Sequence, residues 1–472
     1  MSRYSSHHNK FSYFFRWLMF FAVLACGWYY APSIWLQFNQ INTDDILSAS
    51  KMKNKKFSGK VQEVKSAGLK AYLLEEHSVP IVSIDFMFTN AGSAYEDDEK
   101  QGLIGILSKM LLDGAGSYDA IAFNDTCEEY GIKIGFTSSV DEISGYLHFP
   151  KQNMAMALKM FELVLQKPRF EQEFLDLRKQ QLKTIVKMSL EKPQAILADK
   201  FSEFIFAGHP YSRTQADMLK TIDNINEQDM REFMQTHLSQ ENLIIGVAGD
   251  ISVAQTQDIL QKIFAKLPEK YLGEKLSKIN LELGGREYNV EKSSAQAITF
   301  FAVNGTYRND VDFYPLYMAN YILGGSGLSS RLSQVIREKE GLTYGIYTEF
   351  SESDAVAMVQ GSYSATPDNF NKARELLLDE WRKIAANGVS EEELQQAKDS
   401  LVSSFNLRFA SVGRIASMLT AMQKYDLGLD FLEKRNDYIK AVTLQEVNAA
   451  AKKYFSVTPD FVSIGIKKEE KQ

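Results

Sequence analysis

The sequence predicts an α+β fold made of two duplicated domains that follow a membrane-associated N-terminal segment. Three observations carry this prediction: an apolar, aromatic run near the N-terminus, a globular composition, and a succession of strands and helices that occurs twice. The chain of 472 residues is 45% hydrophobic and 24% charged. It is too long for one ordinary hydrophobic core, so two or more domains are expected.

The first 36 residues form the predicted membrane segment. Basic residues precede an apolar run at 17–31, which with Ile34, Trp35 and Leu36 approaches the roughly 20 residues needed to cross a bilayer. Tryptophan and tyrosine within it suit the membrane interfaces. Residues 1–36 therefore predict a single-pass anchor in the inner (cytoplasmic) membrane, with the folded body in the periplasm or outside. A cleaved signal peptide and a lipid attached at Cys26 are the alternatives.

Charge and cysteine usage exclude several classes of protein. The formal net charge is −7, and no basic stretch is interleaved with aromatic residues, so nucleic acid is not an expected partner. The chain has two cysteines, Cys26 and Cys127, which lie far apart. This number and spacing exclude a disulfide framework and a cysteine metal cluster.

Past a polar linker at 37–58, the same order of elements occurs twice. An alternating strand at 80–88 has its counterpart at 297–303, and both end in a turn containing Asn and Gly. The pattern of the first is typical of a half-buried strand. Further matched strands are expected at 131–136 and 341–346, and at 242–250 and 461–466.

Long amphipathic helices lie between these strands in both halves. A capping box at Ser390 to Glu393 opens one helix, and 170–175 opens its counterpart. Counterparts are roughly 210–220 residues apart, which indicates an internal duplication. The predicted domains are 59–255 and 285–470, joined by a linker at 256–284.

Several short segments carry a resemblance to a known family; they span 102–110, 208–211, 247–250, 323–332 and 337–344. In order and spacing they resemble the pitrilysin/insulinase family of inverted-zincin metallopeptidases, especially its bacterial two-domain members. The resemblance covers nearly everything after the predicted anchor. It implies two metallopeptidase-like domains, each a mostly antiparallel sheet packed with helices.

The metal-binding residues of that family are missing from this sequence. In the family, a His-x-x-Glu-His helix supplies two zinc ligands and the catalytic Glu, and these places read Gly105, Ser108 and Lys109 here. The third ligand, a Glu about 75 residues later, is also missing, since no acid occurs between Asp176 and Glu191. We therefore expect no metal and no catalytic residue in this chain, and expect the helix to persist for packing. A zinc site rebuilt from distant ligands is the alternative.

The resemblance also implies a substrate-binding pair. Arg337 and Tyr344 match an arginine and a tyrosine of the family's C-terminal domain that hold the backbone of the substrate peptide near the scissile bond. Guanidinium and phenol groups donate hydrogen bonds, as peptide carbonyls and a developing oxyanion require. The competing interpretation is that Arg337 pairs with neighbouring acids while Tyr344 fills a core.

These expectations together describe a non-catalytic subunit of a heteromeric zinc metallopeptidase in the cell envelope. A catalytic family member with an intact His-x-x-Glu-His motif would hold the zinc as its partner, and a peptide or unfolded protein would be the substrate. The alternative is a proteolytically inactive scaffold or binding module of the same fold.

Overall fold

The computed structural model describes residues 59–405, 409 and 411–466. The predicted anchor at 1–36 and the linker at 37–58 lie outside these residues. No helix in the described part of the chain is both long enough and apolar enough to cross a membrane.

The first domain contains a six-stranded sheet in the order β1-β2-β6-β3-β5-β4. Its strands are β1 (Gln62–Ser66), β2 (Leu69–Glu75), β3 (Ile81–Thr89), β4 (Lys133–Ser138), β5 (Glu142–Pro150) and β6 (Leu243–Gly249). Its longer helices are α4 (Leu103–Met110), α5 (Ala120–Glu129), α6 (Met154–Gln166), α7 (Gln172–Leu190), α8 (Pro193–Ile205), α9 (Gln215–Thr221), α10 (Glu227–His237) and α11 (Val253–Lys262).

The second domain contains a five-stranded sheet in the order β7-β11-β8-β10-β9. Its strands are β7 (Glu287–Val290), β8 (Ala297–Asn304), β9 (Thr343–Glu352), β10 (Ala357–Ala365) and β11 (Asp460–Ile464). Its α-helices are α12 (Phe313–Asn320), α13 (Phe370–Asn387), α14 (Glu391–Phe405), α15 (Val412–Lys424), α16 (Phe431–Ala441) and α17 (Leu444–Phe455). Two π-helical turns, η7 (Tyr321–Gly325) and η9 (Ser333–Lys339), follow α12.

The two sheets share one topology, as the internal repeat predicts. Strands β2-β6-β3-β5-β4 correspond in order to β7-β11-β8-β10-β9, and β1 is an additional edge strand of the first sheet. In each sheet one pair is parallel, β2 with β6 and β7 with β11, and the other pairs are antiparallel. The expected α+β fold with two related, mostly antiparallel sheets is therefore present.

The core of the first domain continues past residue 255. Helix α11 and the segment after it contribute Ile259, Leu260 and Phe264, and the Phe264 ring lies 5.7 Å from that of Phe161 in α6. Residues 256–267, which the sequence suggested as linker, thus pack on the first sheet. The segment that joins the domains begins after Leu267.

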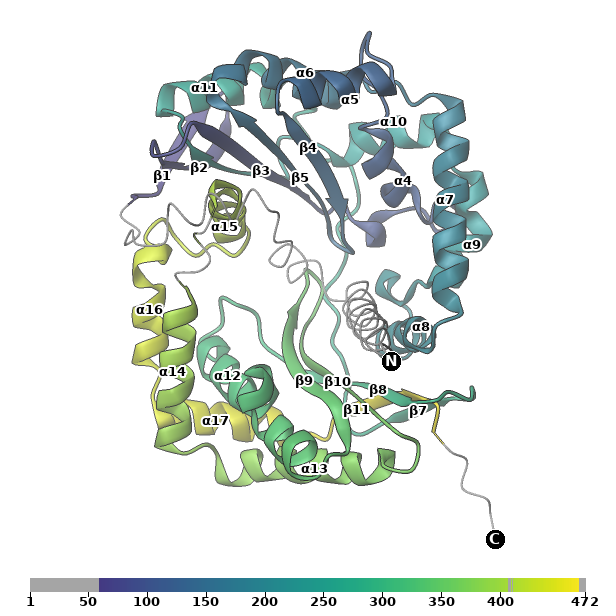
Figure 1. Ribbon diagram of the computed structural model, residues 1–472, viewed down its shortest axis with the longest axis vertical. Helices are drawn as coiled ribbons and strands as arrows, with labels where there is room; N and C mark the ends of the chain where they lie inside the picture. Colours follow the sequence, from purple (N-terminus) through teal and green to yellow (C-terminus); the bar gives the residue numbers. More distant parts are fainter. Residues whose placement is uncertain (1–58, 406–408, 410, 467–472) are drawn as a thin grey trace, which may run out of the picture. The chain divides into compact units, whose positions relative to one another are not determined.

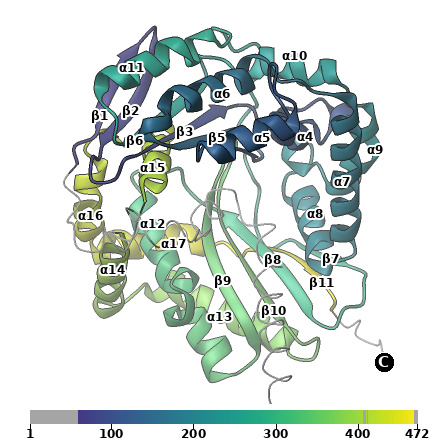
Figure 2. The same ribbon diagram turned by 45° about the horizontal axis from the view of Figure 1, so that its top comes forward.

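Each sheet has one face covered by a helix from the other domain (Figure 1). Helix α15 of the second domain packs on β6, β3 and β2, where Ile415, Ala416 and Leu419 meet Ala248. Helix α8 of the first domain packs on β8 and β11. Figure 2 shows the same two placements from another direction. Both helices have 13 residues and hold equivalent places in the repeat, so the exchange is reciprocal.

This exchange corrects the expectation of a half-buried strand at 80–88. In β3, residues on both faces are buried, including Ser83 and Met87 as well as Ile84 and Phe86. The first core covers one face and α15 covers the other. The alternation in the sequence could not reveal this second cover, because α15 lies more than 300 residues further along the chain.

The contact between α15 and the first sheet predicts a large effect for a small substitution. At Gly246 of β6, an added Cβ would lie 2.2 Å from the Ala416 carbonyl oxygen and 2.9 Å from the Thr420 nitrogen. Because both are helix backbone, Gly246→Ala should lower the free energy of unfolding by about 1–3 kcal/mol. Gly284→Ala, which meets nothing within 4 Å, is the matched control. Equal urea midpoints for the two variants would contradict this packing.

The same contact predicts a pH dependence of stability. Burial under α15 is the main cause that raises the pKa of Asp85 to about 7; Thr420 opposes this rise and the charge of Glu142 adds to it. The unfolded chain has an aspartate pKa near 4. Between about pH 4 and pH 7 the unfolded chain therefore binds fewer protons, so Asp85 makes the free energy of unfolding fall as pH rises. In urea unfolding at stepped pH, Asp85→Asn should flatten this fall and the exposed control Asp125→Asn should not.

Candidate functional site

The helix expected to carry the degenerate metal motif is α4, and its N-terminus is fixed by a buried carboxylate. Glu96 accepts hydrogen bonds from the backbone nitrogens of Gly102 (2.9 Å) and Ile104 (2.7 Å). Burial raises the pKa of Glu96 to about 7, although these two donors favour the ionised form. Leu103 and Met110 lie in the core, which agrees with the packing role that the sequence predicted for this helix.

The three motif positions offer no set of metal ligands. Gly105 has no side chain and lies under α7. Ser108 is buried, and its hydroxyl donates to the carbonyl oxygen of Ile104 at 2.8 Å. Lys109 is exposed. An ammonium and an already bonded hydroxyl are poor zinc ligands.

Helices α4 and α7 are held together by contacts that need no metal. Leu182 of α7 lies over Gly105 of α4 and over Gly102, which directly precedes the helix. Its Cδ2 would be 3.8 Å from a Cβ at Gly105 and 3.5 Å from one at Gly102. Nearby, the Arg178 guanidinium binds both oxygens of the buried Asp113 carboxylate, at 2.7 and 2.5 Å. Across the described ranges, no group of three or more His, Cys, Asp or Glu residues is arranged to hold a metal ion.

The predicted substrate-binding residues lie on two consecutive elements of the second domain. Arg337 is exposed on the π-helix η9, and its Nε lies 3.5 Å from Glu338. Tyr344 is 82% exposed near the start of β9, the edge strand of its sheet. The competing interpretation thus holds in part for Arg337, which has an acidic neighbour, and fails for Tyr344, which fills no core.

A β-bulge explains the exposure of Tyr344. Ala365 of β10 pairs with Thr343 and Ser364 pairs with Gly345, so Tyr344 is an extra residue in β9. The Thr343 hydroxyl donates to the Ser364 carbonyl oxygen at 2.6 Å and accepts from the Gly345 nitrogen at 3.1 Å. Bulges bend a strand and redirect a side chain. Here the bulge turns the phenol of Tyr344 outward.

The glycine-rich segment 323–332 has mainly structural contacts. A Cβ at Gly324 would lie 2.4 Å from the Thr348 hydroxyl and 2.8 Å from its nitrogen, so the π-helix η7 can only approach β9 with glycine there. Arg331 binds both carboxylate oxygens of Glu393 at 2.6 and 2.7 Å. Glu393 also closes the predicted capping box, since Ser390 nitrogen donates to it at 2.8 Å.

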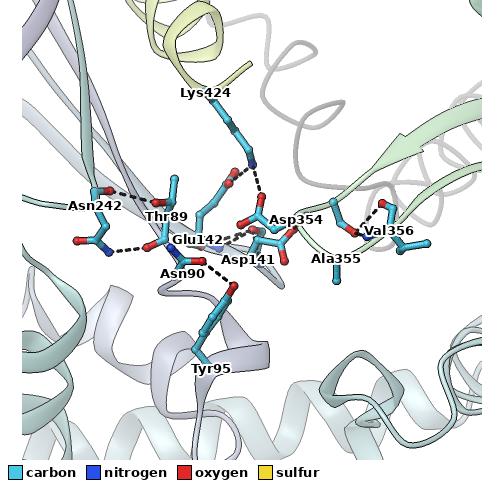
Figure 3. A network of polar contacts seen from close by, with 12 residues as sticks. Thr89, Asn90, Tyr95, Asp141, Glu142, Asn242, Asp354, Ala355, Val356 and Lys424 are labelled. Atoms are coloured by element: carbon cyan, nitrogen blue, oxygen red, sulfur yellow. Dashed lines mark hydrogen bonds and ion pairs between the residues drawn. The ribbon is translucent and has the colours of Figure 1, made fainter. Parts of the chain in front are cut away.

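Sequence reasoning missed a polar junction between the two domains, which Figure 3 shows from close by. Lys424, at the end of α15, forms an ion pair with Glu142 and lies 3.9 Å from Asp354. Burial and the neighbouring Asp141 raise the pKa of Asp354 to about 6, against the effect of Lys424. A cavity of about 570 Å³ opens beside it. The sequence hinted at this junction through the segment 208–211, because Tyr211 of that segment donates a hydrogen bond to Asp141 in the junction.

Comparisons with known proteins agree with this architecture. Residues 72–218 match the family described as "Insulinase (Peptidase family M16)", and residues 224–401 match the "Peptidase M16 inactive domain". A Helicobacter pylori protein described as "Non-peptidase homolog YmxG" is 23% identical, over 87% of this chain and 95% of its own. A Bacillus subtilis protein, "Uncharacterized zinc protease YmxG", is also 23% identical, over 82% of this chain and 94% of its own.

Solved structures show the same fold. The peptidase M16 inactive domain from Pseudomonas fluorescens superposes with a TM-score of 0.81 at 26% identity, covering 87% of this chain and all of that one. The periplasmic protease PqqL from Escherichia coli superposes with a TM-score of 0.74 at 14% identity, over 88% of this chain and 46% of its own. This second likeness concerns the fold alone.

The packing role of α4 predicts a gain of stability when Gly105 is replaced by alanine. Gly105 lies inside a helix, and an added Cβ would make an ordinary contact of 3.8 Å with Leu182. Alanine loses less backbone entropy on folding than glycine, so Gly105→Ala should raise the free energy of unfolding by about 0.5–1 kcal/mol. Gly102→Ala should lower it, because Gly102 has φ 98° and Met218 lies 3.0 Å from its Cβ position. Thermal unfolding of both variants distinguishes the two environments.

Proposed function

Because this chain belongs to the M16 (insulinase) family of peptidases, we propose that it is a non-catalytic, substrate-binding subunit of a heteromeric zinc metallopeptidase in the cell envelope. The partner is a catalytic family member with an intact His-x-x-Glu-His motif, which holds the zinc. The substrate is a peptide or an unfolded protein.

One asymmetry carries the proposal. The places that match the family's metal ligands and catalytic Glu are occupied by Gly105, Ser108 and Lys109. Arg337 and Tyr344, which match the family's substrate-binding pair, are retained and exposed. An exposed tyrosine at a bulge contributes little to packing, so its placement supports a role in binding. In that role Arg337 and Tyr344 donate hydrogen bonds to the carbonyl oxygens of an extended peptide. Zinc held by the partner would supply the activated water, and the same two donors would favour negative charge on the carbonyl oxygen of the scissile bond.

The apolar segment at 17–36 supports the cellular part of the proposal. As a single-pass anchor in the inner membrane, it would hold the peptidase complex where exported or misfolded envelope proteins pass. Protease protection of the folded body in membrane vesicles of known orientation tests this location. Digestion from the cytoplasmic side alone would contradict it.

A second candidate is an inactive scaffold or binding module of the same fold. The description of the Helicobacter pylori relative as a non-peptidase homolog favours it for that relative. A scaffold of this kind makes no use of the two exposed side chains. The double variant Arg337→Ala/Tyr344→Ala distinguishes the two functions, because a scaffold would assemble and act normally with it.

The test of the main proposal uses the full chain, alone and with its catalytic partner. The pure chain should bind no stoichiometric zinc and cleave no peptide. The complex should contain zinc and cleave peptide. In the complex, Arg337→Ala should lower kcat/KM for a peptide by about 10- to 100-fold with the zinc content unchanged. Arg382→Ala is the matched control, since Arg382 is exposed on α13 and pairs with Asp379 and the Leu378 carbonyl oxygen in the adjacent turn of its helix.

Two results would contradict the proposal. Zinc-dependent cleavage by the pure chain would show a metal site rebuilt from other ligands. Equal kcat/KM for the complex carrying Arg337→Ala and the complex carrying Arg382→Ala would remove the substrate-binding role. Mass spectrometry measures the metal content, and a fluorescence assay measures peptide cleavage by the chain and by the complexes.

A further inference from the structure

We infer that Tyr211 and Asp141 are positioning residues that attach the turn of the β9–β10 hairpin to the first domain, and so fix where Tyr344 stands relative to that domain. The inference deepens the proposed function, on which its consequence for cleavage rests. The attachment itself is independent of any activity.

The hairpin turn is buried where a turn would ordinarily be exposed. Ala355 is 2% and Val356 is 4% exposed, and they pack with Ala94, Phe206 and Tyr211 of the first domain. Turns usually lie at the surface because their backbone groups need water. Burial of this one requires partners for its backbone nitrogens and carbonyl oxygens.

The first domain supplies these partners through two side chains. The nitrogen of Asp354 donates to Asp141 Oδ2 at 3.1 Å, and the nitrogen of Ala355 donates to the Tyr211 hydroxyl at 3.2 Å. The Tyr211 hydroxyl in turn donates to the other oxygen of Asp141. Burial and the charge of Asp141 raise the pKa of Tyr211, which keeps the phenol protonated as a donor. Tyr211 and Asp141 thus close one hydrogen-bonded ring around the turn.

Two further contacts reach the same turn. The nitrogen of Ile279, in the segment that joins the domains, donates to the Ala355 carbonyl oxygen at 2.8 Å. Lys424 lies between Glu142 and Asp354, as Figure 3 shows. The turn is therefore held by the first domain, the connector and α15 together.

Tyr344 lies at the opposite end of β9 from this turn. The strand has 10 residues, so the two ends are roughly 30 Å apart at about 3.3 Å per residue. A tilt of about 5° at the turn would move the far end by roughly 2–3 Å over that length. Misplacement of this order is enough to lower the rate of an enzyme-catalysed step. The segment 208–211 thus acts on the substrate-binding residues through the hairpin, without touching substrate.

The experiment measures the placement of the hairpin directly. Spin labels go on Ile121→Cys, which replaces a 74% exposed side chain on α5, and on Gly345→Cys, where an added Cβ meets nothing within 4 Å. Cys26→Ser and Cys127→Ala remove the native thiols. Tyr211→Phe deletes only the hydroxyl and keeps the ring, and Tyr438→Phe on the exposed side of α16 is the matched control.

In the spin-labelled protein that retains Tyr211 and Asp141, double electron–electron resonance should give one narrow distance distribution. Tyr211→Phe should shift its mean or widen it by about 2–3 Å, the displacement that the strand length gives. Tyr438→Phe should leave it unchanged. Asp141→Asn, with Asp125→Asn as its control, gives a second route, because an amide cannot accept from both the phenol and the Asp354 nitrogen without turning its NH₂ toward one donor.

Two measurements distinguish a positioning role of Tyr211 from a general contribution to stability. Hydrogen exchange of the peptide containing Asp354 and Ala355 should be faster in Tyr211→Phe, while the remaining protected amides keep their rates. In the active complex, the same variant should lower kcat/KM with zinc content unchanged. A distance distribution identical to that of Tyr438→Phe would overturn the inference. If Tyr211→Phe alters the distance distribution but the complex with the unsubstituted chain cleaves no peptide, only the proposed function is overturned.

Discussion

Each sheet of this protein is completed by a helix from the other domain, and the remaining architecture depends on this exchange. A sheet with an apolar face must cover it, and here α15 covers the first sheet while α8 covers the second. Neither domain can therefore complete its packing without the other. The exchange joins the domains at two places related by the repeat, and it brings Lys424 at the end of α15 to the junction with Glu142.

Local contacts inside the first domain explain how α4 persists without metal ligands. In a zinc site, metal bonds join the two helices that supply the ligands. Here Leu182 over Gly105 and the ion pair of Arg178 with Asp113 join the corresponding helices, α4 and α7. The apolar side of α4 packs in the first core, and Glu96 holds its N-terminus. These contacts stabilise the helix without a metal.

The order of the elements was predictable because strand alternation, turn residues and the capping box at Ser390 are local signals. The shared topology followed from the repeat. The burial of both faces of β3, the bulge at Tyr344 and the π-helical turns were not predictable in the same way. They depend on register and on contacts between segments far apart in the chain, such as Gly324 against Thr348. The junction at Tyr211 was missed for the same reason.

The family segments divide into those whose side chains are used in packing and those whose side chains are not. Tyr211 binds the hairpin turn, Arg331 binds Glu393, and Gly324 admits Thr348. The Tyr344 side chain is not used in packing. It is the extra, unpaired residue of a β-bulge, and its phenol is exposed to solvent. A fold maintained only as scaffold gains nothing from that arrangement. A surface that holds an extended peptide does, since an outward phenol on an edge strand can donate to a peptide carbonyl oxygen. The bulge is thus the local feature that most favours substrate binding over a scaffold role.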